Sequence, residues 1–107
     1  MSNPSSWILQ RQYEYQRKVN AWLRATLIPG YDASQLRRDA YGSMIAWNEY
    51  GKTTTYGWEV DHELPKSQFP TIATQPGNLR ALHWRNNRAK SDRIDIATIL
   101  KMIGGAQ

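Results

Sequence analysis

Residues 58–65 read WEVDHELP, and they place an acidic residue directly before one of the two histidines of the chain. The aromatic and β-branched residues over 52–62 favour a strand or hairpin, and Pro65, which cannot donate a backbone hydrogen bond, marks its end. Consecutive side chains of a regular strand point to opposite faces. Asp61 and His62 can therefore serve one site only if the strand ends or twists sharply here. The simpler alternative is a hydrogen-bonded surface pair.

The segments after this strand alternate between loop and regular structure. Three prolines and a glycine within residues 65–77 predict a loop. Residues 80–83, RALH, predict a second short strand, and residues 86–92 predict a short helix. Residues 94–103 carry an apolar helical pattern, which the two following glycines are expected to end.

The first half of the chain carries two helical patterns, and both apolar stripes are interpreted as core. Over residues 5–27, the side chains that recur at helical spacing are Ile8, Gln12, Tyr15, Val19 and Trp22. Asp32 followed by Gln35 resembles a capping box, and it predicts a second helix that ends near Gly51. The apolar stripe of this second helix would consist of Leu36, Ala40, Met44 and Trp47.

Length and composition predict one α+β domain with one core, because the chain has 107 residues of which 40% are hydrophobic. We expect a helical part over 1–51, a strand–loop–strand–helix part over 52–92, and a closing helix with a tail over 93–107. There is no run of about eighteen apolar residues, and the first residues lack the order of a secretion signal. The simplest expectation is a soluble, cytoplasmic protein with no membrane contact.

Charge and cysteine content narrow the choice of partners. The net charge of +5 suits a polyanion, because basic residues displace counterions from phosphates. Charge alone does not single out nucleic acid. The absence of cysteine excludes disulfides and cysteine-bound zinc.

Two asparagines follow the Asp61-His62 pair. Asn78, in GNL, lies sixteen residues after His62, and Asn87, in NNRAKSD, lies nine residues after Asn78. With the strand–loop–strand–helix order, this pattern resembles the HNH endonucleases, also called ββα-metal or His-Me finger nucleases. The resemblance is strongest over residues 56–92. It implies a ββα-metal finger, which two N-terminal helices and a C-terminal helix would brace.

The resemblance implies a metal-dependent enzyme that hydrolyses DNA phosphodiester bonds and leaves 3′-hydroxyl and 5′-phosphate ends. His62 would be the base that activates water, since a histidine with a pKa near ~6.5 is partly neutral at working pH. Asp61 and Asn87 would bind the cation that stabilises the leaving 3′ oxygen. Asn78 would fix the loop so that the His62 ring points correctly.

The metal follows from the ligand types. Oxygen donors from Asp61 and Asn87 suit Mg²⁺ or Mn²⁺. Many members of the family also hold a structural zinc through cysteine pairs, and His83 and Asn86 lie where one such pair would fall. With no cysteine, no structural zinc is expected. His83 has two interpretations: a structural residue that packs or bonds to the loop, or a third metal ligand or phosphate contact.

Basic residues surround the motif, and we expect them to position the phosphate backbone of double-stranded DNA without reading its sequence. The candidates are Arg80, Arg85, Arg88, Lys90 and Lys66. A solvated helix face is the alternative interpretation of these charges.

Two other functions fit the pattern. One is a non-catalytic nucleic-acid-binding module that keeps the finger shape, although loss of His62 or Asn87 would then be expected. The other is a nuclease subunit that cuts only within a larger complex, because 107 residues leave little room for separate target recognition. A protein partner would then supply specificity or inhibition.

Overall fold

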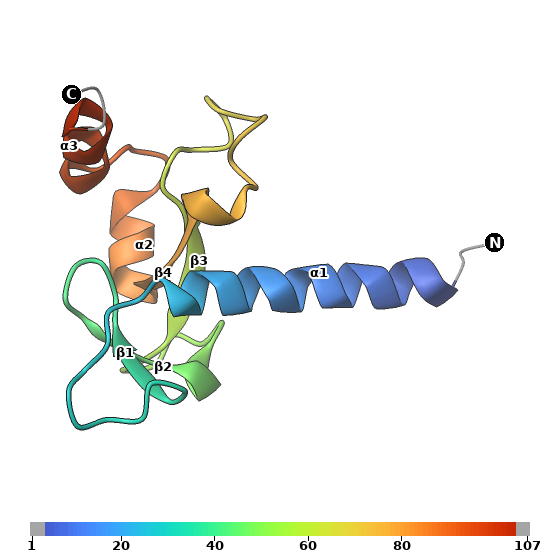
Figure 1. The fold of residues 1–107 in the computed structure, drawn as a ribbon, viewed down its shortest axis with the longest axis horizontal. Coiled ribbons are helices and arrows are strands. Elements are labelled where there is room, and N and C mark those ends of the chain that lie inside the picture. The colour runs from blue at the N-terminus through green and yellow to red at the C-terminus, as the bar shows by residue number, and fades with distance from the viewer. Residues whose placement is uncertain (1–3, 105–107) are drawn as a thin grey trace.

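The computed structural model describes residues 4–104, and this part of the chain is an α+β fold with three α-helices and two two-stranded antiparallel sheets (Figure 1). Short 3₁₀ turns precede β3, at Trp47–Glu49, and β4, at Pro76–Asn78. In chain order, the elements are α1 (Pro4–Leu23), β1 (Leu36–Arg38), β2 (Met44–Ala46), β3 (Trp58–His62), β4 (Leu79–His83), α2 (Trp84–Lys90) and α3 (Ile96–Gly104).

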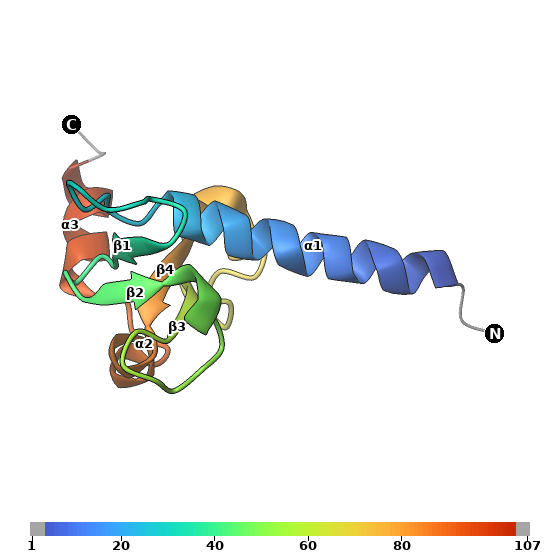
Figure 2. The ribbon, with the colours of Figure 1, turned by 90° about the horizontal axis from the view of Figure 1, so that it is seen from below.

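Helix α1 projects from the rest of the molecule, and only its C-terminal end is packed (Figures 1 and 2). Residues 5–16 are exposed, whereas Ala21 and Trp22 are buried. The predicted helix over 5–27 is therefore confirmed as far as Leu23 and is wrong beyond it. The backbone of Thr26 instead pairs with that of Arg38, with N–O distances of 2.8 and 2.9 Å.

The predicted second helix is wrong, because its residues form the hairpin β1–β2, with Arg37 paired to Ile45. The turn is built by Asp39, whose Oδ1 accepts hydrogen bonds from the backbone N–H groups of Tyr41 and Ser43 at 2.9 and 2.8 Å. Aspartate side chains favour such turns. Gly42 adopts a φ of +89°, which few other residues tolerate. The first 51 residues are thus one helix and a hairpin, and one N-terminal helix replaces the expected two.

The second half agrees more closely with the predictions. β3 and β4 pair antiparallel, from Trp58 opposite His83 to His62 opposite Leu79. The strand expected within 52–62 occupies only 58–62, and the strand expected at 80–83 begins one residue earlier. The helix expected at 86–92 is α2, which begins and ends two residues earlier. The closing helix is α3, and Gly105, the second glycine expected to end it, lies outside the described residues.

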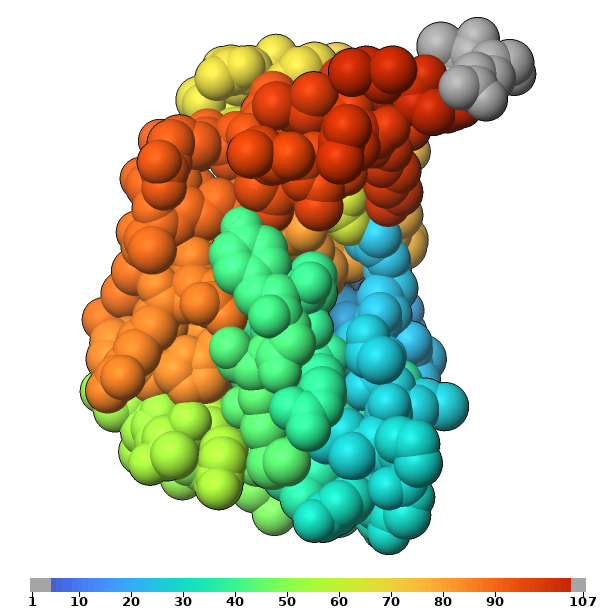
Figure 3. Space-filling model, turned by 90° about the vertical axis from the view of Figure 1, so that its left-hand side faces the viewer, coloured from blue at the N-terminus to red at the C-terminus, as the bar shows by residue number. Residues whose placement is uncertain are grey.

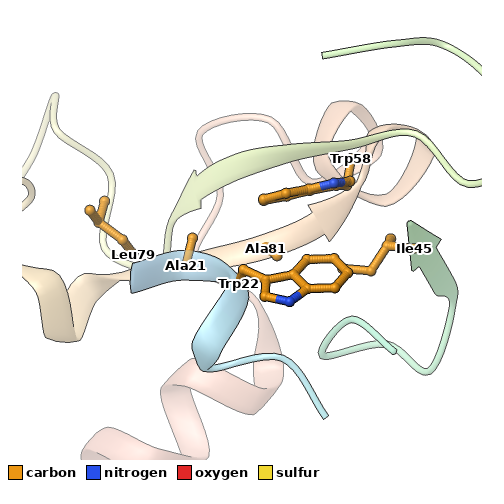
Figure 4. Packing of buried hydrophobic residues seen from close by; sticks show 6 residues of the cluster. All are labelled: Ala21, Trp22, Ile45, Trp58, Leu79 and Ala81. Carbon is orange, nitrogen blue, oxygen red and sulfur yellow. The ribbon is translucent and has the colours of Figure 1, made fainter. Parts of the chain in front are cut away.

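Trp58 is the centre of the core, and its side chain is fully buried (Figure 4). Its ring centroid lies 5.2 Å from that of Trp22 and 4.8 Å from that of Tyr50. Its indole Nε1 donates to the carbonyl oxygen of Ala46 at 2.8 Å, so the buried N–H is satisfied. One side chain therefore joins α1, β2 and β3. The buried apolar cluster consists of Ala21, Trp22, Ile45, Trp58, Leu79 and Ala81.

Helix α3 lies over the hairpin and beside α2 (Figure 3), and polar contacts attach it. The Tyr41 hydroxyl donates to Asp95, just before α3, at 2.7 Å, and Lys101 pairs with Glu63 at 3.3 Å. Large apolar side chains of α3 are exposed, including Ile96 and Leu100. No helix within residues 4–104 combines the length and apolar character needed to cross a membrane.

Replacement of the central tryptophan tests this description of the core. Trp58→Ala should lower the free energy of unfolding by about 3–5 kcal/mol, because it opens a cavity among three aromatic rings. The matched control is Trp7→Ala, since Trp7 is 62% exposed on the projecting part of α1, and it should change stability by less than about 0.5 kcal/mol. Urea unfolding followed by circular dichroism measures the stability of both variants. Equal losses of stability would contradict the assignment of Trp58 as the centre of the core.

Candidate active site at the end of β3

Strand β3 presents its side chains alternately to two helices. Trp58 packs against Trp22 of α1, and on the opposite face Asp61 accepts a hydrogen bond from Lys90 of α2 at 3.0 Å. His62 shares the face of Trp58, because side chains two residues apart lie on the same side of a strand. Asp61 and His62 therefore leave β3 on opposite faces.

The end of β3 brings these two side chains to one place. His62 is the last residue of the strand, and a hollow of about 250 Å³ at this point is lined by Asp61, His62 and Asn87. Most of the remaining lining is polar, from Lys66, Ser67, Ser91 and Asp92. The structure thus brings together the residue predicted as the base and both residues predicted as metal ligands.

The His62 ring is half-buried and open to the hollow. Within residues 4–104, we find no hydrogen bond to the ring, while the backbone carbonyl oxygen of His62 accepts from Lys90 Nζ at 3.0 Å. Burial, which is the largest cause, and the Arg17 guanidinium lower the pKa of His62 below its ordinary value of 6.5, although Asp61 opposes the shift. A ring that is neutral near pH 7 and has an open nitrogen can accept a proton from water.

Asp61 holds two buried cations. Its carboxylate is 5% exposed, and Oδ1 accepts from Lys90 Nζ at 3.0 Å while Oδ2 accepts from Arg80 Nε at 2.9 Å. Lys90 and Arg80 are themselves 4% and 7% exposed. An unpaired charge at such a position would be costly, so each member of the cluster depends on the others.

The cluster continues to the start of α3. Arg80 also pairs with Asp95, which accepts from the Tyr41 hydroxyl and from the backbone N–H of Thr98. Burial and the hydrogen bond to Asp95 raise the pKa of Tyr41 to about 12, so its hydroxyl stays protonated and donates. Burial alone would raise the pKa of Asp95, but hydrogen bonds from Thr98, Arg80 and Tyr41 hold it well below its usual range.

Asn78 fixes the backbone immediately beyond His62. Its amide Oδ1 accepts from the N–H of Leu64 at 2.8 Å, and its Nδ2 donates to the carbonyl oxygens of Leu64 and Ala73, both at 3.0 Å. The next residue, Leu79, pairs with His62 across the sheet. The contacts of Asn78 are therefore those that a residue positioning the His62 segment would make.

The oxygen donors that line the hollow are of the type that binds hard cations such as Mg²⁺. Asn87 donates to Glu59 through Nδ2 at 3.0 Å, so the nitrogen end of the amide is engaged and the other end, Oδ1, is an oxygen donor. The Asp61 oxygens accept from Lys90 and Arg80, but a carboxylate can accept about four hydrogen bonds or metal contacts in total. No group of three His, Cys, Asp or Glu side chains suited to a metal is found within residues 4–104. A cation held by Asp61 and Asn87 would keep several water ligands, as Mg²⁺ commonly does.

His83 is built into the fold rather than into the hollow. Its Nε2 donates to the carbonyl oxygen of Thr55 at 2.8 Å, and its Nδ1 accepts from the backbone N–H of Arg85 at 3.1 Å, where it caps α2. Both nitrogens of the ring are therefore used within the fold. Of the two sequence interpretations, the geometry matches the structural one.

The predicted phosphate-binding residues divide into two groups. Arg80 and Lys90 are buried in the ion cluster, so they are not available to an external phosphate. Arg85 and Arg88 are exposed on α2, with guanidinium carbons 5.1 and 5.4 Å from a ring centroid of Trp84. Lys66 is exposed and lines the hollow itself.

Two residues with structural roles at the site were missed from the sequence. Asp39 is 2% exposed, and its Oδ2 accepts from the backbone N–H of His83 and from Asn86 Nδ2, at 2.9 and 2.8 Å. It therefore ties the hairpin to the start of α2, and the turn signal in DAYGS could have identified it. Glu59 accepts hydrogen bonds from Asn87 and Arg88, and no local pattern in the sequence indicates that role.

Comparison of this chain with protein-family models, with curated proteins and with solved structures gave no match in any of the three.

Removal of the central charge tests the ion cluster. Asp61→Asn keeps the shape of the side chain but leaves Lys90 and Arg80 without their shared carboxylate, so the free energy of unfolding should fall by about 3–5 kcal/mol. Asp92→Asn is the matched control, because Asp92 lines the same hollow but is exposed. A similar small change in both variants, measured by urea unfolding, would show that the cluster contributes little.

The pH dependence of stability tests Asp95. Because its pKa is lower in the folded state, the contribution of Asp95 is complete above its unfolded pKa of about 3.8 and is lost as pH falls toward the folded value. Asp95→Asn should therefore be less stable than the parent by a constant amount at neutral pH, and the difference should narrow only below about pH 4. Urea unfolding at a series of pH values measures this difference in stability. If the difference already narrows above about pH 5, the pH dependence does not come from Asp95.

Proposed function

We propose that this protein is a metal-dependent endonuclease of the HNH type that hydrolyses phosphodiester bonds in DNA. The observation that carries the proposal is the polar hollow at the end of β3, which His62, Asp61 and Asn87 line together. These three residue types supply a base and two oxygen ligands, and they converge although their positions span residues 61–87 of the chain. In the same proposal, β3, β4 and α2 form the ββα-metal finger.

His62 begins the reaction. Its neutral ring accepts a proton from a water molecule, and the resulting hydroxide attacks phosphorus in line with the 3′ oxygen, which leaves. Asn78 holds the backbone after His62, so the ring keeps its direction during proton transfer. The leaving 3′ oxygen takes a proton from water and His62 returns its proton to solvent, so the products are a 3′-hydroxyl and a 5′-phosphate.

Asp61 and Asn87 would hold the cation. When bound, a divalent ion such as Mg²⁺ or Mn²⁺ supplies Lewis-acid stabilisation of the charge that develops on phosphorus and on the leaving oxygen. Lys90 and Arg80 keep the Asp61 carboxylate in place, because each donates to one of its two oxygens. Their role in this proposal is to position a ligand, and the DNA backbone is left to the exposed Lys66, Arg85 and Arg88.

The two histidines of the chain provide a matched pair of variants. His62→Asn should reduce nicking of supercoiled plasmid in Mg²⁺ or Mn²⁺ by ~10²–10⁴-fold, because the base is lost. His83→Asn should retain cleavage, since asparagine also caps a helix and His83 faces Thr55. Chelator should abolish nicking by the parent, and circular dichroism checks that both variants are folded.

Each outcome of the plasmid assay is informative. Equal cleavage by His62→Asn and the parent would show that the proposed base is wrong. Absence of cleavage by the folded parent with either ion would overturn a free-standing nuclease. In that case, a subunit that cuts only with its partner, or a non-catalytic nucleic-acid-binding module, becomes the better description.

A further inference from the structure

Helix α1 crosses the face of β3 that carries Trp58, Val60 and His62 (Figure 1). A hollow of about 390 Å³ lies between α1 and β3. Its charged lining comes from α1, with the cations Arg11, Arg17 and Lys18 and the acid Glu14, and Val60 lines it from β3. Val60 also lines the hollow that contains His62. The two hollows therefore adjoin along β3, and α1 brings its basic residues to the edge of the candidate active site.

Arg17 is the residue of α1 whose contacts are incomplete. Its Nε is buried and has no hydrogen-bond partner, and the ion pairs found within residues 4–104 do not include it. Its guanidinium carbon lies 5.8 Å from the ring centroid of Tyr13, which is a weak contact. A buried donor without an acceptor is costly. The Arg17 side chain as a whole is only half-buried and lines the hollow, so its guanidinium group can meet an anion that enters there.

Arg17 lies over the face of β3 that also carries His62. It lines one hollow together with Val60, and Val60 lines the next hollow together with His62. Lys18 differs, because its Nζ lies over the rings of Trp47 and Tyr50, at 4.1 and 4.8 Å from their centroids. Of these two cations, Lys18 is held by aromatic rings of the core, whereas Arg17 has only the weak contact with Tyr13 within residues 4–104.

We propose that Arg17 binds the non-bridging oxygens of the nucleic-acid phosphate that lies in front of His62. The guanidinium group offers paired N–H donors whose spacing matches two phosphate oxygens. This inference rests on the proposed function, because it takes the phosphodiester as the group presented to His62. It makes α1 part of the substrate-binding surface, rather than only a brace for the strands.

DNA binding without cleavage is the first test. The probe is a fluorescein-labelled duplex of about 20 base pairs, long enough to span several phosphates, titrated by anisotropy in the presence of chelator. Arg17→Met should weaken binding about tenfold, and it should reduce the slope of log K against log salt by about one, because one phosphate contact is lost. The control is Arg38→Met, since Arg38 is exposed on β1 and bonds to Gly42, and it should change affinity by less than about twofold.

Stability separates phosphate binding from a purely structural role. Because Nε of Arg17 makes no hydrogen bond, Arg17→Met should be at least as stable as the parent in urea unfolding, since the methionine keeps the aliphatic packing. A loss of stability together with unchanged DNA affinity would show that Arg17 only supports the fold. Equal effects of Arg17→Met and Arg38→Met on affinity, or no binding of the duplex by the parent, would also overturn the inference.

Cleavage assays distinguish failure of this inference from failure of the proposed function. If the parent cuts, Arg17→Met should lower kcat/KM at least about tenfold, and Arg17→Lys should recover part of the loss. If Arg17→Met cuts and binds DNA as the parent does, the inference about Arg17 is wrong, but the proposed nuclease function is not contradicted. Binding that depends on Arg17 in a parent that never cuts would support the phosphate site and overturn the nuclease.

Discussion

The Asp61 carboxylate is the one negative charge on which the arrangement of β3, β4 and α2 depends. It accepts from Arg80 of β4 and from Lys90 of α2, and all three side chains are buried. Without the Asp61 carboxylate, the buried cations Lys90 and Arg80 would repel each other, and water could not hydrate them. Lys90 also donates to the carbonyl oxygen of His62. The cluster that holds α2 against the sheet of β3 and β4 therefore also fixes the end of β3.

This constraint shapes the electrostatics of the hollow. Asp61 is paired with Lys90 and Arg80, so the other charged side chains that line the hollow are Lys66 and Asp92, which balance each other. The hollow therefore holds little net negative charge to attract a bare cation. In the proposed nuclease, the phosphate of the substrate would therefore supply part of the ligand set of the metal, which is how Mg²⁺ is commonly held at phosphate-processing sites.

The aromatic core explains how a projecting helix can take part in a site. Trp22 near the end of α1 packs on Trp58, and this contact fixes the side of the helix that faces β3. Successive turns of a helix are about 5.4 Å apart, and residues about one turn before Trp22 line a hollow together with Val60 of β3. Arg17 and Lys18 occupy that turn, and the packing of one tryptophan pair thereby decides where two cations lie.

The sequence alone predicted the second half of the fold and the candidate site more closely than the first half. Alternation and turn residues within 52–92 are local signals, and strand, loop, strand and helix all follow from them. The grouping of Asp61, His62 and Asn87 was expected only from the resemblance to the HNH endonucleases. Over 32–51, the helical spacing of apolar residues was equally compatible with a hairpin, because a stripe of four residues does not reveal its partner. There Asp39 settles the structure by accepting hydrogen bonds from its own turn and from His83, which lies forty-four residues later. Only the tertiary structure could decide that Arg80 and Lys90 are buried partners of Asp61, that both nitrogens of His83 are used, and that Arg17 lines a hollow with Val60. These contacts join side chains that are distant in the chain. They form because a charge in the low-dielectric interior needs a partner, and no local sequence pattern indicates which partner it will meet.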